Sequence, residues 1–592
     1  MSTQVFPTEA ASTPTSKLGQ QIAFVGLVIY VLFAPHSVAV SASGVGIAGL
    51  GWLIRTLGTR TLGLRRSKFD LVIALLLLWS IASAFLSEEP QISIPKLVAL
   101  WSVFLFYLTR ATVNRRTAFV LVALLILSGC FGALFSAFDL VRGRGVVVER
   151  IGFNSPFHQV GIEPGDTIWQ VNRRRVYSVA DLDEILRHIP ANTPIAVGII
   201  SRGEQVERPG MAVHASREAS RSEIFGSERN HRFRASGLTR HYPTFAELMQ
   251  MIALLALGLA LAHLRNHGPN KYFRVALVAA LLLTMGLVFT AMRTVIVALV
   301  LGASVIAWRS LRGVYKLVFT FALFFVLAFG AVVVWQTRDH NSLLLGDPSS
   351  SLRMHVARVG LSRIPVHPIF GHGMDAMKQH WNEWGFPGKD MLHLHSTPLQ
   401  LAFDRGLPLL VIWMWMMILF WLTLARAERS AADLSDTNAY GILLGTLGAL
   451  TGFLVSSLVN YNYGDAEVAM LFWFLMGIGV GRGDAETGRR GDVKGNLPVS
   501  LSSRLRVALP RFFAFDPEVI RHREHARNAV RGVIRQRPIA TAGNNSFERH
   551  VSATDHDVNR RIRSTQVAMK PTHVRDRAVR RHTDSIVKAR QR

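Results

Sequence analysis

Residues 118–139 read AFVLVALLILSGCFGALFSAFD, an apolar run in which Asp139 is the only charged residue. An α-helix needs about 20 mainly apolar residues to cross a bilayer, and this run is long enough. Half of the 592 residues are hydrophobic and 18% are charged, whereas soluble chains carry about 25% charged residues. This composition excludes a simple globular enzyme, a fibrous protein and a disordered chain. It predicts a polytopic membrane protein.

Other apolar windows predict an all-α membrane domain of about 12 transmembrane helices. Besides 118–139, they lie near 21–36, 38–56, 69–87, 95–112, 244–264, 272–291, 293–308, 315–337, 406–426, 439–461 and 465–481. Lys and Arg gather in alternate loops, and positive loops stay cytoplasmic. Both ends of the chain are therefore expected inside, with residues 1–20 as a cytoplasmic N-terminus and no cleavable signal. The single cysteine, Cys130, excludes an intramolecular disulfide.

This pattern divides the chain into segments. Spans one to five are expected in 21–139, six to nine in 244–337 and ten to twelve in 406–482. A domain at 145–213 and a loop at 338–405 are expected to face outward, the loop carrying the catalytic residues. Residues 483–592 are expected to form a largely disordered, basic cytoplasmic tail, because they lose hydrophobic periodicity and hold 24 Lys and Arg against 11 Asp and Glu.

Residues 145–213 alternate strand and turn signals with one amphipathic helix, which predicts a small α+β domain. Its three decisive stretches are SPFHQVGIEPGDTIWQVN (155–172), VYSVADLDEIL (176–186) and PIAVGIISRGEQV (194–206). Their order resembles a PDZ domain of the bacterial periplasmic-protease type. Such domains bind an extended peptide at a sheet edge, so a protein partner is implied. A docking module with no peptide-binding activity remains the alternative.

Ionisable residues gather at the outer ends of the later spans. Arg293 lies between two apolar runs, and Arg353 lies on an expected amphipathic helix. VHPIFGHGMDAM (366–377) and HLHSTPLQLAFDRG (393–406) follow. Each arginine alone is more often a membrane-end anchor than a functional group. Taken in order, the elements resemble the O-antigen ligase and Wzy-type polymerase superfamily, and RASGLTRHYPTFAELM (234–249) matches the stretch before one of its central spans.

That resemblance implies a GT-C-like glycosyltransferase of the bacterial inner membrane whose active site faces the periplasm. The donor would be an undecaprenyl-diphosphate-linked glycan, and the acceptor a hydroxyl of a lipid or glycan. His395 matches the family's histidine and is the candidate base, with His393 as the alternative. Arg293 and Arg353 are the candidate diphosphate ligands, because guanidinium groups bind phosphate oxygens in pairs. Possible supporting residues are Asp404, Arg234, Gly371 and Gly373.

The expected reaction inverts the anomeric centre and uses no cofactor. No metal is expected, because the arginines supply the counter-charge and Glu88 with Glu89 lacks an evident third ligand. Asp404 orients a histidine or an arginine, or is only a polar residue at a helix end. A ligase that caps lipid A-core and a polymerase that extends carrier-linked glycan share these signatures, so both remain open.

Two other function classes compete. A transporter or flippase for lipid-linked glycan predicts acids or broken helices near the middle of the bilayer. A membrane scaffold would act through the PDZ-like domain. For the basic tail, attraction to anionic lipids is favoured over nucleic acid, because the arginine runs lack interleaved aromatic residues.

Overall fold

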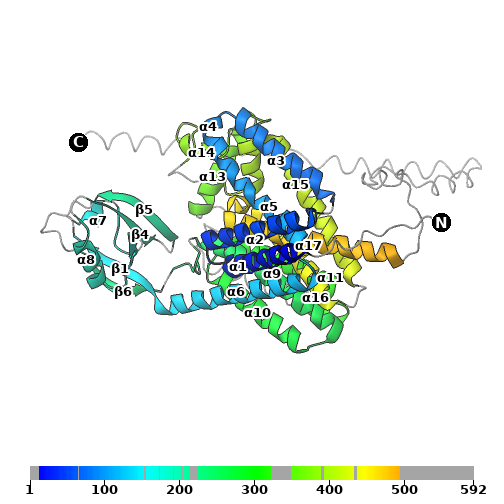
Figure 1. The fold of residues 1–592 in the computed structure, drawn as a ribbon. Helices are drawn as coiled ribbons and strands as arrows, with labels where there is room; N and C mark the ends of the chain where they lie inside the picture. Colours follow the sequence, from blue (N-terminus) through cyan, green and yellow to red (C-terminus); the bar gives the residue numbers. More distant parts are fainter. Residues whose placement is uncertain are drawn as a thin grey trace, which may run out of the picture. The chain divides into compact units, whose positions relative to one another are not determined.

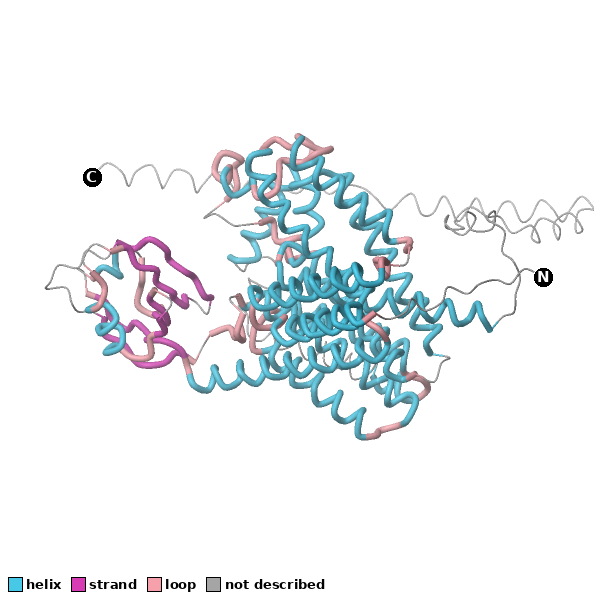
Figure 2. Tube along the Cα trace, viewed as in Figure 1, coloured by secondary structure: helices cyan, strands magenta, loops and turns pink. Residues whose placement is uncertain are grey.

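The computed structural model confirms a mostly helical membrane protein (Figures 1 and 2). It describes residues 13–493 except 65, 153–154, 160, 173, 191–192, 202–203, 213–223, 232, 240, 320, 322–347, 388–392 and 433–435. Within these residues ten helical segments are long and apolar enough to cross a membrane. They are α1 (Pro14–Phe33), α2 (Val38–Thr59), α3 (Phe69–Leu86), Pro90–Thr112, α6 (Arg115–Arg142), α9 (Tyr242–His267), α10 (Lys271–Val288), α11 (Arg293–Ser310), α15 (Thr397–Ala432) and α16 (Thr437–Ser457).

The remaining predicted spans differ in detail. The segment Pro90–Thr112 joins α4 (Pro90–Ser93), the 3-10 helix η1 (Ile94–Val103) and α5 (Phe104–Thr112). The twelfth predicted span is the shorter apolar part, Ala466–Gly481, of α17 (Ala466–Val493). Most of the ninth, 315–337, and all of the tail beyond 493 lie outside the described residues. The helix α1 begins at Pro14, earlier than expected, because Thr13 caps it by accepting from the Ser16 backbone.

Helices α9 and α16 form the centre of the bundle, where nearly all of their side chains are buried. They approach each other closely at Gly258 and Gly445, where a Cβ on Gly258 would lie 2.4 Å from the Gly445 Cα. Small residues let membrane helices pack backbone to backbone. Helices α10 and α11 pack on α9, and α15 packs on α3, α16 and α17.

The 145–213 region forms the strands of one antiparallel sheet, shown in magenta in Figure 2. The strand order is β5-β4-β2-β1-β6, with β3 paired to β2. The bounds are β1 (Arg144–Ile151), β2 (Thr167–Val171), β3 (Arg174–Arg175), β4 (Pro194–Ser201), β5 (Glu204–Ala212) and β6 (Ile224–Asn230). The last strand lies beyond the expected end at 213. It pairs with β1 from Arg144 opposite Asn230 to Ile151 opposite Ile224.

The sheet has its own apolar core, which includes Val148, Ile168, Val197 and Leu182. Its helices are α7 (Pro156–Gln159) and α8 (Val179–Arg187). Ser178 caps the start of α8, since its hydroxyl accepts a hydrogen bond from the Asp181 backbone at 3.1 Å. The expected α+β architecture is present, whereas the relationship to PDZ domains stays a prediction.

Three short elements and one kink complete the outer segments: α13 (Pro348–Arg363), α14 (Ala376–Gln379) and η3 (Asn462–Gly464). The helix expected around Arg353 is α13, but its apolar and polar residues are not separated onto two faces as the expected amphipathic pattern requires. Helix α15 begins at Thr397, nine residues before the predicted span, but its backbone bends at Gly406, where φ is 84°. The predicted start at 406 therefore marks the kink, and 397–405 is helix instead of loop.

Candidate functional site

A cavity of about 560 Å³ forms where separate parts of the chain meet. Pockets of roughly 300–1,000 Å³ are typical of small-ligand sites. The starts of α9 and α11, helix α13, the segment before α15 and the turn after α16 all contribute walls. The lining residues are Tyr242, Pro243, Thr244, Glu247, Met292, Arg353, Asp375, His393, His395, Asn460, Tyr461, Asn462, Gly464 and Asp465.

One wall of this cavity is basic. Arg353 comes from α13, and His393 and His395 come from the segment that leads into α15, with ring centroids 4.4 Å apart. The Arg353 Nε and the His393 Nδ1 are buried and have no hydrogen-bond partner among the described residues. Buried polar groups are normally paired, so such groups at a cavity are ready to bind a ligand. The predicted Arg353 and His395 are thus brought together, beside the alternative His393.

His395 has an unusual backbone and an unusual ring. Its φ is +54°, and Asp375 in the same cavity has a φ of +67°. Left-handed conformations of residues other than glycine gather at functional sites. Burial, the adjacent His393 and then the charge of Arg353 lower the pKa of His395 to about 3. The imidazole is therefore neutral at physiological pH and has a lone pair to accept a proton.

The opposite wall is acidic and amide-rich. Glu247 on α9 accepts hydrogen bonds from Ser456 and, at 3.2 Å, from the Asn460 amide. Its Oε2 is buried and unpaired within the described part of the chain. Asp465 accepts a hydrogen bond from the Thr244 hydroxyl. The same cavity is therefore lined by hydrogen-bond acceptors as well as by basic groups.

Arg293 and Arg234 lie next to cavity residues without lining the cavity themselves. Arg293 is exposed at the first residue of α11. It follows the lining residue Met292 and precedes Thr294, whose hydroxyl accepts from Asn460 at 3.3 Å. Arg234 donates to the Tyr242 hydroxyl at 2.7 Å. Arg293 is therefore next to a lining residue in the chain, and Arg234 contacts one, but their roles in the site stay predictions.

Asp404 is connected to the histidine segment through one intermediate residue. The Gln400 amide donates to Asp404 at 2.8 Å, and its carbonyl accepts from the Leu394 backbone at 2.7 Å. Leu394 lies between the two cavity histidines. Asp404 and Gln400 also line a second cavity of about 300 Å³, which shares Asp375, Tyr461 and Gly464 with the first.

Gly371 and Gly373 form a backbone joint with the kink of α15. The His372 backbone donates to the Phe403 carbonyl at 2.9 Å, and the Gly373 backbone donates to the Asp404 carbonyl at 3.0 Å. A Cβ on Gly371 would lie 2.4 Å from the Asp404 carbonyl carbon, and one on Gly406 would lie 1.9 Å from the Ile369 oxygen. The two predicted glycines thus have a packing role and do not line the cavity.

Replacing Gly406 with alanine is expected to destabilise the fold. At φ 84° and ψ 166° the backbone of Gly406 is in a region that essentially only glycine adopts, so the strain of an alanine costs about 1–3 kcal/mol, and overlap in a packed site costs about 1–3 kcal/mol more. Gly385→Ala is the matched control, because its φ is +77° but nothing lies within 4 Å of the added Cβ. Thermal unfolding in detergent should show a larger loss of stability for Gly406→Ala. Equal losses would mean that the joint with Ile369 does not constrain the kink.

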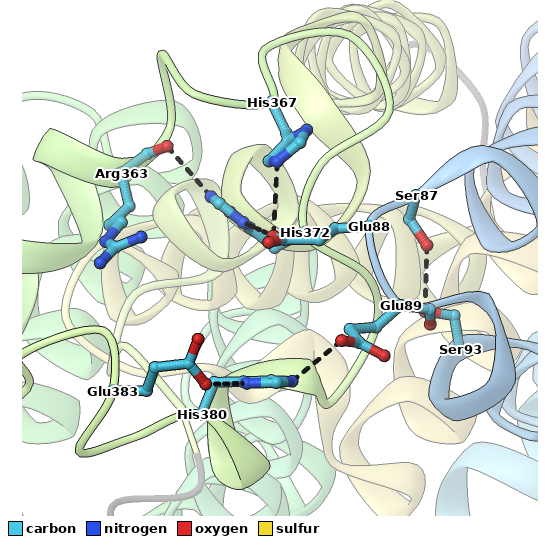
Figure 3. A network of polar contacts seen from close by, with 9 residues as sticks. All are labelled: Ser87, Glu88, Glu89, Ser93, Arg363, His367, His372, His380 and Glu383. Atoms are coloured by element: carbon cyan, nitrogen blue, oxygen red, sulfur yellow. Dashed lines mark hydrogen bonds and ion pairs between the residues drawn. The ribbon is translucent and has the colours of Figure 1, made fainter.

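A second cluster of ionisable residues lies outside both cavities (Figure 3). Although the sequence shows no third ligand for Glu88 and Glu89, the structure brings two histidines to Glu88. The ligand atoms of Glu88, His367 and His372 all lie within 4.8 Å of one another. These residues have the spacing that a metal ion needs.

Sequence reasoning missed several cavity residues. Glu247 could have been predicted, since an ionisable residue inside an apolar run marks a functional site. The polar run NYNYGD (460–465) between two apolar windows carried a weaker one. In contrast, nothing near His372 in the sequence points to Glu88, because 284 residues separate them.

The comparisons with known proteins agree with the resemblance. No curated protein matches the chain. Residues 278–414 match the family model of O-antigen ligases. The matched range contains Arg293, Arg353, His395 and Asp404, together with both glycines of the joint. Residues 278–414 are therefore similar to the O-antigen ligases, which supports the superfamily that the sequence predicts.

Proposed function

We propose that the protein transfers a glycan from an undecaprenyl-diphosphate carrier to an acceptor hydroxyl, with inversion at the anomeric carbon, at the outer face of the bacterial inner membrane. The observation that carries this proposal is the meeting of Arg353, with its unpaired Nε, and the neutral His395 in one cavity. Both residues lie in the segment that matches the O-antigen ligases.

The leaving group is a diphosphate, and its charge grows as the glycosidic bond breaks. Arg353 has a buried guanidinium nitrogen free to bind it, and a guanidinium stays charged when it loses water. Arg293, exposed at the rim, supplies a second positive charge. Together they provide the counter-charge that a divalent metal provides in other glycosyltransferases.

His395 takes the proton of the acceptor hydroxyl while the hydroxyl oxygen attacks the anomeric carbon. The bond from that carbon to the phosphate oxygen breaks on the opposite side, and its electron pair leaves with undecaprenyl diphosphate. Burial, and after it the charges of His393 and Arg353, lower the pKa of His395 in the free protein, and a bound diphosphate offsets the part that comes from these charges. Donor binding therefore raises the basicity of His395 as the reaction needs it.

Asp404 has a positioning role in this scheme. Its hydrogen bond to Gln400 holds the amide whose carbonyl accepts from Leu394. The backbone between His393 and His395 is thereby fixed, which keeps the His395 ring directed at the acceptor. The second cavity, which shares Asp375 and Tyr461 with the first, is proposed to admit the acceptor.

The rate at low donor concentration is expected to change little between pH 8 and pH 5. This rate, kcat/KM, reports the free protein, in which the pKa of His395 is about 3. A histidine with the ordinary pKa of 6.5 would lose about 30-fold over that interval. The fraction of folded protein must be measured in parallel, because a buried neutral histidine makes the fold less stable as pH falls below 6.5. A 30-fold fall with the protein still folded contradicts the role given to His395.

The direct test uses purified protein, undecaprenyl-diphosphate glycan and lipid A-core in detergent or nanodiscs. Glycan attached to lipid A-core is the expected product. Longer carrier-linked chains made without that acceptor would identify a polymerase instead. If neither product forms although both substrates are shown to bind, the result contradicts glycan transfer and favours transport.

A further inference from the structure

The consecutive residues Glu88 and Glu89 lie between α3 and α4, and each contacts histidines that follow α13 (Figure 3). Glu88 contacts the Nδ1 of His372, and the Nε2 of His367 lies 3.5 Å from the same carboxylate oxygen. These three residues form what we call the Glu88 cluster. None of them lines either cavity.

The hydrogen bonds of His372 leave one position that needs a cation. Its Nε2 lies 3.0 Å from the Arg363 carbonyl oxygen, which can only accept, so the Nε2 carries a proton. In the neutral ring the Nδ1 then presents a lone pair to the Glu88 carboxylate. Two acceptors face each other at a side chain that is 1% exposed. A proton shared between the two atoms completes this contact in the ion-free protein, and a metal ion that binds here displaces that proton and separates the two atoms.

The neighbouring histidine favours a metal ion. A second proton on His372 would satisfy the contact between His372 and Glu88. It would not explain why His367 also directs a ring nitrogen toward Glu88. The rings of His367 and His372 lie at right angles with centroids 4.9 Å apart, and both direct a nitrogen toward Glu88. Ligands about 2.0–2.1 Å from a tetrahedral zinc ion lie about 3.3 Å apart. The spacing of 3.5 Å between His367 and Glu88 is close to this value.

The surroundings of the Glu88 cluster also suit zinc. A histidine that binds a metal usually donates its other ring nitrogen to a carbonyl or carboxylate, which fixes the tautomer. His372 does so toward Arg363. Two imidazoles and one carboxylate favour zinc over magnesium or calcium, which prefer oxygen ligands. His367 and Glu88 are 40% and 34% exposed, so an ion has a path from solvent.

We propose that Glu88, His367 and His372 bind one zinc ion that joins the turn after α3 to the loop before Gly373. Within two residues of Gly373 that loop reaches Asp375, which lines both cavities and pairs with Lys96 at 2.5 Å. The three side chains leave one position of a tetrahedral ion open to solvent, and the ion binds outside the transfer cavity and takes no part in the glycan chemistry.

The neighbouring contact supplies a matched control. The His380 ring meets Glu89 at 3.0 Å through its Nε2 and Glu383 at 2.6 Å through its Nδ1. The hydrogen bond to Glu383, together with the charges of Glu383 and Glu89, raises the pKa of His380. Both ring nitrogens donate to carboxylates, so this group is complete without a metal.

The experiment measures zinc in the full chain, purified without a histidine tag, stripped with a chelator and dialysed against dilute zinc chloride. Elemental analysis is expected to find about one more zinc ion per chain in the wild type than in Glu88→Gln or His367→Gln. Glu89→Gln should keep the wild-type amount. The exposed His367 allows this test even if a variant of the buried His372 fails to fold.

Thermal unfolding gives a second readout that does not depend on transfer activity. Added zinc should raise the unfolding midpoint of the stripped wild type and of Glu89→Gln, but not that of Glu88→Gln. Equal zinc content in the wild type and Glu88→Gln, or no effect of zinc on the wild-type midpoint, overturns the site.

Discussion

His395→Gln is expected to lower the transfer rate about 10²- to 10⁴-fold, the usual contribution of a positioned general base. Glutamine keeps a polar group of similar size but cannot take the proton of the acceptor hydroxyl. The ring lines the cavity and is neutral in the free protein, so its loss removes the base without removing a positive charge. The fall should appear in kcat at saturating donor, since donor binding depends on the arginines.

Two further variants test whether the effect belongs to His395 itself. His393→Gln should cost less, because that ring lines the cavity and supports the charge without taking the proton. His355→Gln, exposed on α13 outside both cavities, should retain wild-type activity. A large loss in His393→Gln with an active His395→Gln would move the base to His393.

Arg353→Ala is expected to lower the rate about 10²- to 10³-fold, as does removal of one donor to a developing negative charge in other enzymes. Arg353→Lys should recover only part of this loss, because lysine keeps the charge but loses the planar fork that binds two phosphate oxygens. The alanine variant should also have a raised pKa for His395, since the guanidinium charge helps to lower it. Burial still keeps that pKa low in the variant, so any acidic fall of kcat/KM should start at a higher pH than in the wild type.

Arg358→Ala on the same helix is the matched control. Its side chain is exposed and lines neither cavity, so its activity should stay within about twofold of wild type. Equal losses in Arg353→Ala and Arg358→Ala would indicate damage to α13 instead of loss of a diphosphate ligand.

The membrane architecture could be predicted because it follows from local composition. A long run of apolar residues favours the bilayer whatever the rest of the chain does, and most of the expected spans are helices in the structure. Errors arose where local signals compete. The window rule placed the tenth span at 406, because Asp404 and Arg405 break the apolar run. Both are buried within α15, which passes through this point and bends at Gly406.

Site residues could be predicted where they belong to a short sequence motif. They could not be predicted where the site forms only because segments distant in the sequence come together. Arg353 and His395 stand in ordered motifs, and the structure places both at one cavity. The sheet was expected to end at 213, because β6 has few apolar residues and belongs to it only by pairing with β1. The contact of Glu88 with His372 depends on how α3 packs against the kinked α15, which no local pattern states.

The pairing of β1 with β6 determines how changes in the sheet affect the helices on either side of it. The first and last strands of the sheet are neighbours, and Arg144 lies opposite Asn230. Partner residues in an antiparallel pair lie about 5 Å apart. The chain that leaves α6 and the chain that returns toward α9 are therefore close together where they enter and leave the sheet. The sheet can therefore be lengthened or removed while the helices on either side keep their places, because only a short connection is needed between Arg144 and Asn230.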